Sequence, residues 1–396
     1  MGIGTTPSLT LRRKEFAYFV AMCVPMFLNG WTDASAGPLL PRLQAHYEIG
    51  YIVVSMIFVA NCIGAITAAL TNMWLTTRFG LGITVALAAA AHCLSYAIQA
   101  TKPPFPLMAI SFAINGFGEG LFEAQTNGLV ALLPTNPNAK LSFMHGLYGV
   151  GAFASPLIAT QFSNMPTNWH RYYLVSLGLG LAALGILLWV TRLKHQDALL
   201  HEIGVHPEED TNRAPLIRQV MELKIVHIMA AFILFYVGME VTVGGWTVTF
   251  MQRTRGAGSG AGYVSSGFFG GVAVGRMGLI WVNRKVGLQR VIYIYSLAAI
   301  ALELTVWFVP SLYENAVAVA FVGVVIGPFY PIAMRVTSVL VPRRALAGAI
   351  GWISCVGRIG SAAFPFAFAL MASKATLLSC LLGIWFLVPS IQQRTD

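Results

Sequence analysis

Charge is scarce in this chain of 396 residues. Only 10% of its residues are charged, whereas 57% are hydrophobic, and a soluble domain carries about 25% charged residues. The mean hydropathy is +0.70, and 192–224 is the one long polar segment. This composition excludes the soluble globular class and predicts an integral membrane protein.

Signatures of catalysis and of metal binding are also missing. The five cysteines lie in apolar stretches, and none pairs with another at metal-ligand spacing. His201 and His206 lie five residues apart, not the four that place two zinc ligands on one helix face. No Walker lysine motif is present to bind ATP. We therefore expect no enzyme and no cofactor, with a proton gradient as the driving force.

What the chain does have is a series of about twelve apolar stretches. A hydrocarbon core about 30 Å thick needs about twenty apolar residues per helix, and continuous apolar runs favour helices over the alternating strands of a barrel. The predicted spans are 16–40, 51–76, 81–99, 105–133, 140–164, 172–191, 225–251, 260–282, 288–309, 313–340, 345–371 and 376–391.

The polar segment 192–224 divides these spans into two sets of six. Most Lys and Arg residues then fall on the side that holds both termini, as the positive-inside rule requires of the cytoplasm. The net charge of +10 thus reports orientation in a bilayer rather than binding to nucleic acid. The expected parts are a cytoplasmic N-terminus (1–15), a first six-helix bundle (16–191), a cytoplasmic loop (192–224), a second six-helix bundle (225–391) and a cytoplasmic C-terminus (392–396).

Two internal echoes indicate that the halves are repeats. Gly151 lies five residues before a proline in span five, and Gly360 does the same in span eleven. The joints 77–80 and 284–287, after spans two and eight, are both short, basic and end in glycine. Repeated bundles of this kind are the layout of many secondary transporters.

Ionisable groups within spans are expensive to insert, so they are functional candidates. Asp33 lies in span one, one helical turn after Asn29, so the two side chains share a face. Carboxyls one turn apart in a low dielectric resist joint ionisation, which suits loading and unloading of a proton. Span four carries such a pair within a row at four-residue spacing, which predicts the wall of an aqueous cavity: Asn115, Glu119, Glu123 and Asn127.

Further candidates lie in other spans. His145 opens span five and could relay a proton or bind a hydroxyl group. Glu240 lies one turn before the run 244–246, which predicts an interrupted helix. Trp246 would either stack on a solute ring or act as an ordinary interfacial tryptophan. Arg358 in span eleven requires a counter-charge, which an acid of span one or span four would supply.

Several motifs resemble the major facilitator superfamily, and within it the fungal group similar to the proton-coupled fucose permease. The likeness covers the chain from residue 16 on and is carried by 30–42, 115–128, 144–152, 244–246 and 327–331. One departure concerns the acidic residue that usually precedes Arg-x-Gly after span two. Thr77 replaces it here, and Arg284 stands at the equivalent place in the second half.

The resemblance implies two six-helix bundles around a cavity lined mainly by spans one, four, seven and ten. It also implies that an acid in span one and another in span four carry the proton. Asp33 and Glu119 match those places, with Glu123 as a competitor for the second role. The expected solute contacts are Asn29, Asn115, Gln125, Asn127, His145, Glu240, Trp246, Tyr330 and Arg358.

We therefore expect a multi-pass membrane protein that acts as a secondary transporter, a proton-coupled symporter of a small polar solute such as a sugar. An antiporter exporting amphipathic compounds would favour a more aromatic cavity with a single acid. A non-transporting nutrient sensor on the same fold would carry long cytoplasmic tails, and the predicted tails are short. The expected partners are the lipid bilayer, the solute and protons, in a monomer, with the plasma membrane as the default location.

Overall fold

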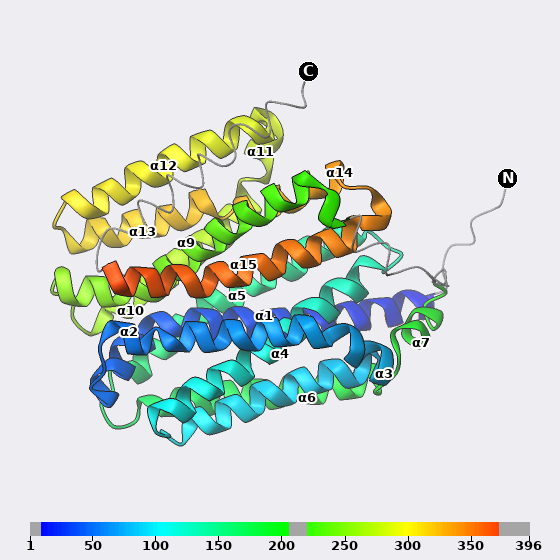
Figure 1. Cartoon of the computed structure of the whole chain (residues 1–396), viewed down its shortest axis with the longest axis horizontal. Coiled ribbons are helices and arrows are strands. Elements are labelled where there is room, and N and C mark those ends of the chain that lie inside the picture. Colours follow the sequence, from blue (N-terminus) through cyan, green and yellow to red (C-terminus); the bar gives the residue numbers. More distant parts are fainter. Residues whose placement is uncertain (1–8, 206–219, 372–396) are drawn as a thin grey trace.

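The computed structural model describes residues 9–205 and 220–371, and helices form most of this part of the chain (Figure 1). The first half contains α1 (Leu9–Tyr47), α2 (Tyr51–Val54), α3 (Met56–Ala100), α4 (Phe105–Ala131), α5 (Pro137–Ser163), η1 (Trp169–Arg171), α6 (Tyr172–Thr191) and α7 (Gln196–His201). The second half contains α9 (Lys224–Thr254), η2 (Ser259–Ala261), α10 (Gly262–Gly278), α11 (Ile280–Val286), α12 (Leu288–Phe308), α13 (Leu312–Ile326), α14 (Phe329–Leu340) and α15 (Arg343–Met371).

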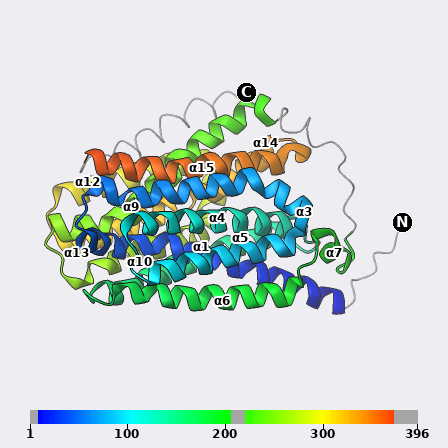
Figure 2. The same cartoon turned by 60° about the horizontal axis from the view of Figure 1, so that its bottom comes forward.

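The long helices run roughly along one axis of the molecule, and the two halves lie side by side (Figures 1 and 2). Each half builds its own apolar core. Leu121 and Leu187 are buried in the first half, and Phe268 and Val322 are buried in the second. Eight helical stretches among the described residues are long and apolar enough to cross a membrane. This all-helical architecture agrees with the predicted fold class.

Two predicted spans fall within the single helix α3. A straight helix of its 45 residues would be about 68 Å long, far more than the hydrocarbon thickness of about 30 Å. Gly80 interrupts it with φ 83° and ψ 168°, a conformation that glycine adopts without the steric cost of a Cβ. Figure 1 shows that α3 turns back on itself within its length. Span 51–76 thus corresponds to α2 and the first arm of α3, and span 81–99 corresponds to the second arm.

The second half repeats this turn. Gly287 has φ 95° and joins α11 to α12, so the two basic joints that echo each other in sequence end in glycines of the same unusual conformation. Predicted span 260–282 is α10 followed by α11. Span 313–340 is divided at Pro328 into α13 and α14, because proline lacks the N–H that a continuous helix requires. The predicted span 376–391 lies outside the described residues.

Glycines let helices approach closely at equivalent places in the two halves. A Cβ on Gly151 of α5 would lie 2.1 Å from the carbonyl oxygen of Phe27 in α1. A Cβ on Gly360 of α15 would likewise lie 2.1 Å from the carbonyl oxygen of Leu234 in α9. The similar glycine and proline spacing in spans five and eleven therefore corresponds to the same packing in both halves. It brings α5 against α1 and α15 against α9, the helices that carry much of the site.

Ion pairs connect the start of α1 to α5 and to the segment that follows α7. Glu15 of α1 pairs with Lys140 of α5. Glu202, just after α7, pairs with Lys194 and, at 3.0 Å between Nζ and Oε2, with Lys14. Hydrogen bonds from these two ammonium groups lower the pKa of Glu202 to about 2. This short segment after the first half is therefore attached to α1 by charge at any pH near neutrality.

We expect Gly360→Ala to destabilise the protein, because the added methyl group would meet a backbone carbonyl. Overpacking of this kind costs about 1–3 kcal/mol. Gly351→Ala in the same helix is the matched control, since no atom lies within 4 Å of a Cβ there. Thermal unfolding in detergent should give a lower Tm for Gly360→Ala than for Gly351→Ala. Equal Tm values would contradict the close packing of α15 on α9.

Candidate functional site

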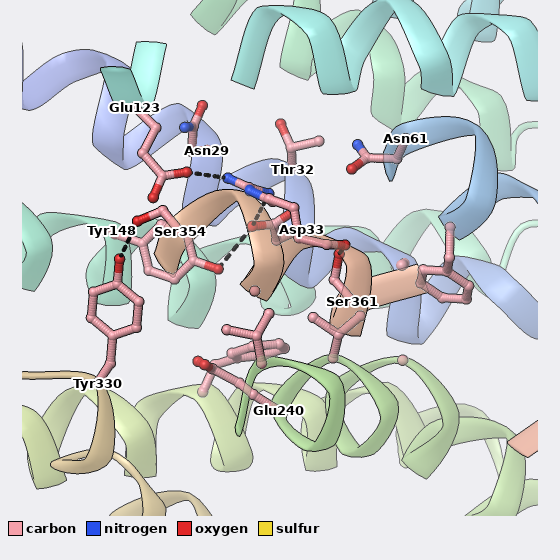
Figure 3. A pocket seen from close by; sticks show the side chains of 18 of the residues that line it. Asn29, Thr32, Asp33, Asn61, Glu123, Tyr148, Glu240, Tyr330, Ser354 and Ser361 are labelled. Atoms are coloured by element: carbon pink, nitrogen blue, oxygen red, sulfur yellow. Dashed lines mark hydrogen bonds and ion pairs between the residues drawn. The ribbon is translucent and has the colours of Figure 1, made fainter. Parts of the chain in front are cut away.

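A cavity lies between the two halves, and both contribute to its wall (Figure 3). Its volume is about 120 Å³ measured with a water-sized sphere. One water needs about 10–15 Å³ on this measure, so the cavity has room for several waters or a small solute. Phe58, Phe112 and Phe269 give the wall an apolar surface, on which the polar groups are few and specifically placed.

The expected lining by spans one, four, seven and ten is correct in part. These spans correspond to α1, α4, α9 and the pair α13 and α14, and all four spans contribute to the wall. However, α14 provides Tyr330 alone among the described lining residues. Helix α15, in predicted span eleven, provides Ser354, Gly357, Arg358 and Ser361.

Arg358 projects from α15 toward the acids of the first half. Its Nη2 lies 2.9 Å from Glu123 Oε2, a bond drawn in Figure 3. Its Nη1 lies 3.2 Å from Glu119 Oε2 and 4.0 Å from Asp33 Oδ2. The counter-charge that Arg358 requires is therefore supplied by α1 and α4. Since the guanidinium belongs to the second half and the carboxylates to the first, this cluster is an ionic tie between the halves.

Glu119 lies behind the cavity wall and is fully buried. The four-residue spacing in α4 puts it on the same face as Asn115 and Glu123. Asn61 Nδ2 of α3 donates to Glu119 Oε2 at 3.2 Å, and Asn115 Nδ2 donates to Oε1 at 3.4 Å. Asn29 Nδ2 of α1 donates to the Glu119 backbone carbonyl at 3.3 Å. Amide donors from three helices thus surround this acid.

Asp33 lines the cavity and connects α1 to α5. Tyr148 Oη donates to Asp33 Oδ2 at 2.8 Å (Figure 3). The same tyrosine ring packs against the guanidinium of Arg276, whose Cζ lies 5.5 Å from the ring centroid. Tyr148 therefore bridges the acid of the first half and a cation of the second half.

The second half has a charge pair of its own. Arg276 Nη2 of α10 lies 3.0 Å from Glu240 Oε1 of α9, and it donates to Tyr236 Oη at 3.1 Å. The interrupted helix expected at 244–246 is wrong, because α9 continues from Lys224 to Thr254. Gly244 instead lies against two neighbouring helices, and a Cβ there would be 2.4 Å from Phe269 Cζ of α10. A Cβ on Gly37 of α1 would lie 2.5 Å from the Gly244 carbonyl oxygen.

Some polar atoms of the site have no hydrogen-bond partner within the described part of the chain. They are the acceptors Asn29 Oδ1 and Asn115 Oδ1 and the donor Arg276 Nε, all buried. Buried polar groups are normally hydrogen-bonded. Asn29 and Arg276 both line the cavity, from opposite halves, but these two atoms, Asn29 Oδ1 and Arg276 Nε, are buried within its wall.

His145 and Tyr330 lie together on the cavity wall, with ring centroids 5.9 Å apart. His145 Nε2 is 3.1 Å from Asn127 Oδ1, and Tyr330 Oη is 3.3 Å from Ser354 Oγ. Asn127, expected to contact the solute, thus holds the histidine from behind rather than lining the cavity itself.

Asn115, which contacts Glu119, is not among the residues that line the cavity, and two further predicted contact residues lie away from it. Gln125 Nε2 donates to Asn72 Oδ1 at 2.5 Å and to Thr76 Oγ1 at 2.6 Å, which places it between α4 and α3. The Trp246 ring lies 5.6 Å from both Tyr51 and Phe368. The structure thus packs Trp246 between neighbouring aromatic rings, and this residue is not among those that line the cavity.

Among the residues of the site that sequence reasoning did not identify are Asn61, Tyr148 and Arg276. A signal existed for two of them. Arg276 is a charge within a predicted span, which always calls for a partner inside the membrane. Tyr148 follows His145 by three residues and therefore shares its helix face. Asn61 gives no such signal, because a lone amide in an apolar helix does not reveal which neighbour it faces.

Two helical halves that enclose a charged cavity are the arrangement of a membrane transporter. Comparison with known families agrees with this class. The family model described as Major Facilitator Superfamily matches residues 22–365. The chain therefore belongs to the major facilitator superfamily, whose members are transporters rather than enzymes.

Individual relatives are distant. Bypass of stop codon protein 6 of Saccharomyces cerevisiae is 25% identical over 93% of this chain and 80% of its own length. A glucose/mannose transporter of Bacillus subtilis is 20% identical over 80% of this chain and 79% of its own length. The crystal structure of a D-xylose-proton symporter matches with a TM-score of 0.73 at 14% identity, covering 94% of this chain and 97% of the symporter. At this identity the structural likeness shows the fold. The fucose-permease subgroup stays a prediction.

Removing the central cation tests the geometry of the site. We expect Arg358→Gln to lower Tm most at alkaline pH, where Asp33, Glu119 and Glu123 would be left ionised without a counter-charge. The loss should shrink as the pH falls, because protonation then removes the uncompensated charge. Thermal unfolding across a pH series measures this, with the exposed Arg335→Gln of α14 as the control. A loss of Tm that does not vary with pH would contradict the ionic tie.

Proposed function

We propose that this chain is a proton-coupled symporter of a small, neutral, polar solute of the sugar class. The observation that carries the proposal is the cluster in which Asp33, Glu119 and Glu123 meet Arg358 beside the cavity. Proton gain or loss by these carboxyls changes the charge at the boundary between the two halves. The proton gradient is then the driving force, with no cofactor.

Coupling follows from the change in bond strength when a carboxylate is protonated. A carboxylate is held to Arg358 by the attraction of opposite charges as well as by hydrogen bonds, whereas a protonated carboxyl keeps only a hydrogen bond to the guanidinium. Protonation therefore weakens the hold of the first-half acids on Arg358. The halves are then freer to move against each other, which exposes the cavity to the other side of the membrane. Deprotonation on that side restores the tie.

A polyhydroxylated solute suits the cavity because each hydroxyl both donates and accepts. The hydroxyls can bond to polar side chains that line the cavity from both halves, such as Asn29 and Ser361. The apolar side of a sugar ring would pack on Phe58, Phe112 or Phe269. Two relatives support this class of solute, since their names state glucose, mannose and D-xylose. A cavity with several acids also differs from the single-acid, more aromatic site expected of an amphipath antiporter.

We expect the double variant Asp33→Asn, Glu119→Gln to lose proton-driven accumulation while retaining solute exchange. The neutral side chains mimic the protonated acids, so they can load solute but cannot release a proton. The measurement is uptake of labelled D-glucose, D-mannose and D-xylose into proteoliposomes with and without an inward proton gradient, together with counterflow exchange at equal pH.

Glu303→Gln is the matched control. It removes an acid from α12 that is not among the residues lining the cavity, so proton-driven accumulation should persist. Full pH-dependent accumulation in the double variant would contradict the coupling role of the cluster. Failure of the wild-type protein to transport any neutral sugar would contradict the proposed solute class. The same preparation tests our expectation of a monomer, and localisation in cells tests the plasma membrane.

A further inference from the structure

Acidic groups outnumber cations around Arg358. Three carboxyl groups share its single guanidinium, with nearest atoms 2.9 Å, 3.2 Å and 4.0 Å away. One guanidinium neutralises one carboxylate. If all three acids were ionised, the cluster would carry two negative charges without a counter-charge.

The surroundings provide no further free cation among the described residues. Arg276 is paired with Glu240 at 3.0 Å, so these two charges cancel. His145 can satisfy Asn127 Oδ1 as a neutral imidazole, because one ring N–H is sufficient. The titratable and charged side chains that face the cluster from neighbouring elements are Cys62 and Tyr96 of α3, His145 and Tyr148 of α5, Glu240 of α9, Arg276 of α10, Tyr330 of α14 and Cys355 of α15.

Uncompensated charge at such a site is costly. The penalty for each buried ion is several kcal/mol even after relaxation of the protein. Asp33 and Glu123 are only 20% exposed and Glu119 is fully buried. A neutral solute cannot cancel the excess. The arrangement seen here is therefore electrically balanced when two of the three carboxyls hold protons.

Geometry indicates which acids these are. Glu123 makes the shortest contact with Arg358, at 2.9 Å, and is its natural counter-ion. Asp33 lies furthest from the guanidinium, at 4.0 Å. Glu119 is the most deeply buried of the three, and the unpartnered Asn115 Oδ1 lies in the amide that contacts Glu119 Oε1. Rotation of that amide would let Asn115 accept the proton of a neutral Glu119.

We infer that this transporter carries two protons with each solute molecule, one on Asp33 and one on Glu119, while Glu123 remains the counter-ion of Arg358. The inference rests on the proposed function and extends it to the coupling ratio. Each proton is taken from water on one side of the membrane, forms one O–H bond with a carboxylate, and is released to water on the other side. Glu123 is a positioning residue. Because it pairs with the guanidinium of Arg358, Asp33 and Glu119 are left free to bind protons.

The coupling ratio is measured from accumulation at equilibrium. Proteoliposomes with the wild-type protein are clamped at a series of membrane potentials without a pH gradient, using whichever of D-glucose, D-mannose and D-xylose is transported. One accompanying charge gives tenfold accumulation for about 59 mV, and two charges give about hundredfold. We expect about hundredfold. Tenfold would overturn the inference but leave proton symport intact, and no dependence on potential or on pH would overturn the proposed function itself.

Variants separate the counter-ion from the proton sites. In Glu123→Gln, Arg358 needs Glu119 as its counter-ion, so one proton site is lost and accumulation should fall to about tenfold for the same potential. Glu123→Asp retains the charge and should remain near hundredfold, as should the control Glu303→Gln. Hundredfold accumulation in Glu123→Gln would overturn the role assigned to Glu123.

Infrared absorption by protonated carboxyl groups provides a test that needs no solute. At neutral pH, Glu123→Gln should contain one protonated carboxyl fewer than the wild-type protein, although Glu123 itself is ionised in the wild type. The reason is that Glu119 must ionise to replace it. Asp33→Asn should lose one protonated carboxyl by direct removal. An unchanged carboxyl absorption in Glu123→Gln would overturn the charge balance on which the inference depends.

Discussion

The attraction between Arg358 and the acids of α1 and α4 is the constraint on which the rest of the structure depends. The acids stand on the first half and the guanidinium on the second, so the site is complete only when the halves face each other. Neither partner tolerates loss of the other, because an unpaired buried charge costs several kcal/mol. Protonation is the change that relaxes this constraint without removing an atom. In the proposed mechanism, the same few side chains therefore govern the charge of the site and the motion between the halves.

The fold serves this cluster by bringing backbones close together. Glycines let α5 pack on α1 and α15 pack on α9 at equivalent places, so the helices that carry the acids and the guanidinium are held rigidly within their own halves. Contacts between the halves include the approach of Gly37 to Gly244. Motion of one half against the other can then change the distance between charges without deforming either half. This division into rigid parts and a charged boundary suits alternating access.

Much of this could be predicted from the sequence, because a bilayer permits few architectures. Apolar length gave the helices, and the glycine echoes marked equivalent turns and packing contacts. Charged residues within spans, such as Asp33 and Arg358, could be identified as functional candidates because a charge is costly to insert into a membrane. The sequence could not predict which groups share a wall. Gln125 and Trp246 are polar or aromatic residues in promising motifs, yet they face neighbouring helices, because helix rotation is set by packing across the whole half. Only the structure shows that a second charge pair, Arg276 with Glu240, lies near the Arg358 cluster and that Tyr148 connects the two.

The central claim is that proton movement and solute movement through this protein are one process. Its most direct test is proton flux driven by solute alone, measured in proteoliposomes that carry a pH-sensitive dye and have equal pH on both sides. Adding a transported sugar outside, with membrane potential short-circuited, should acidify the interior in proportion to the sugar that enters, and the double variant Asp33→Asn, Glu119→Gln should show no such change. Sugar entry through the wild-type protein without any change in internal pH would contradict the account.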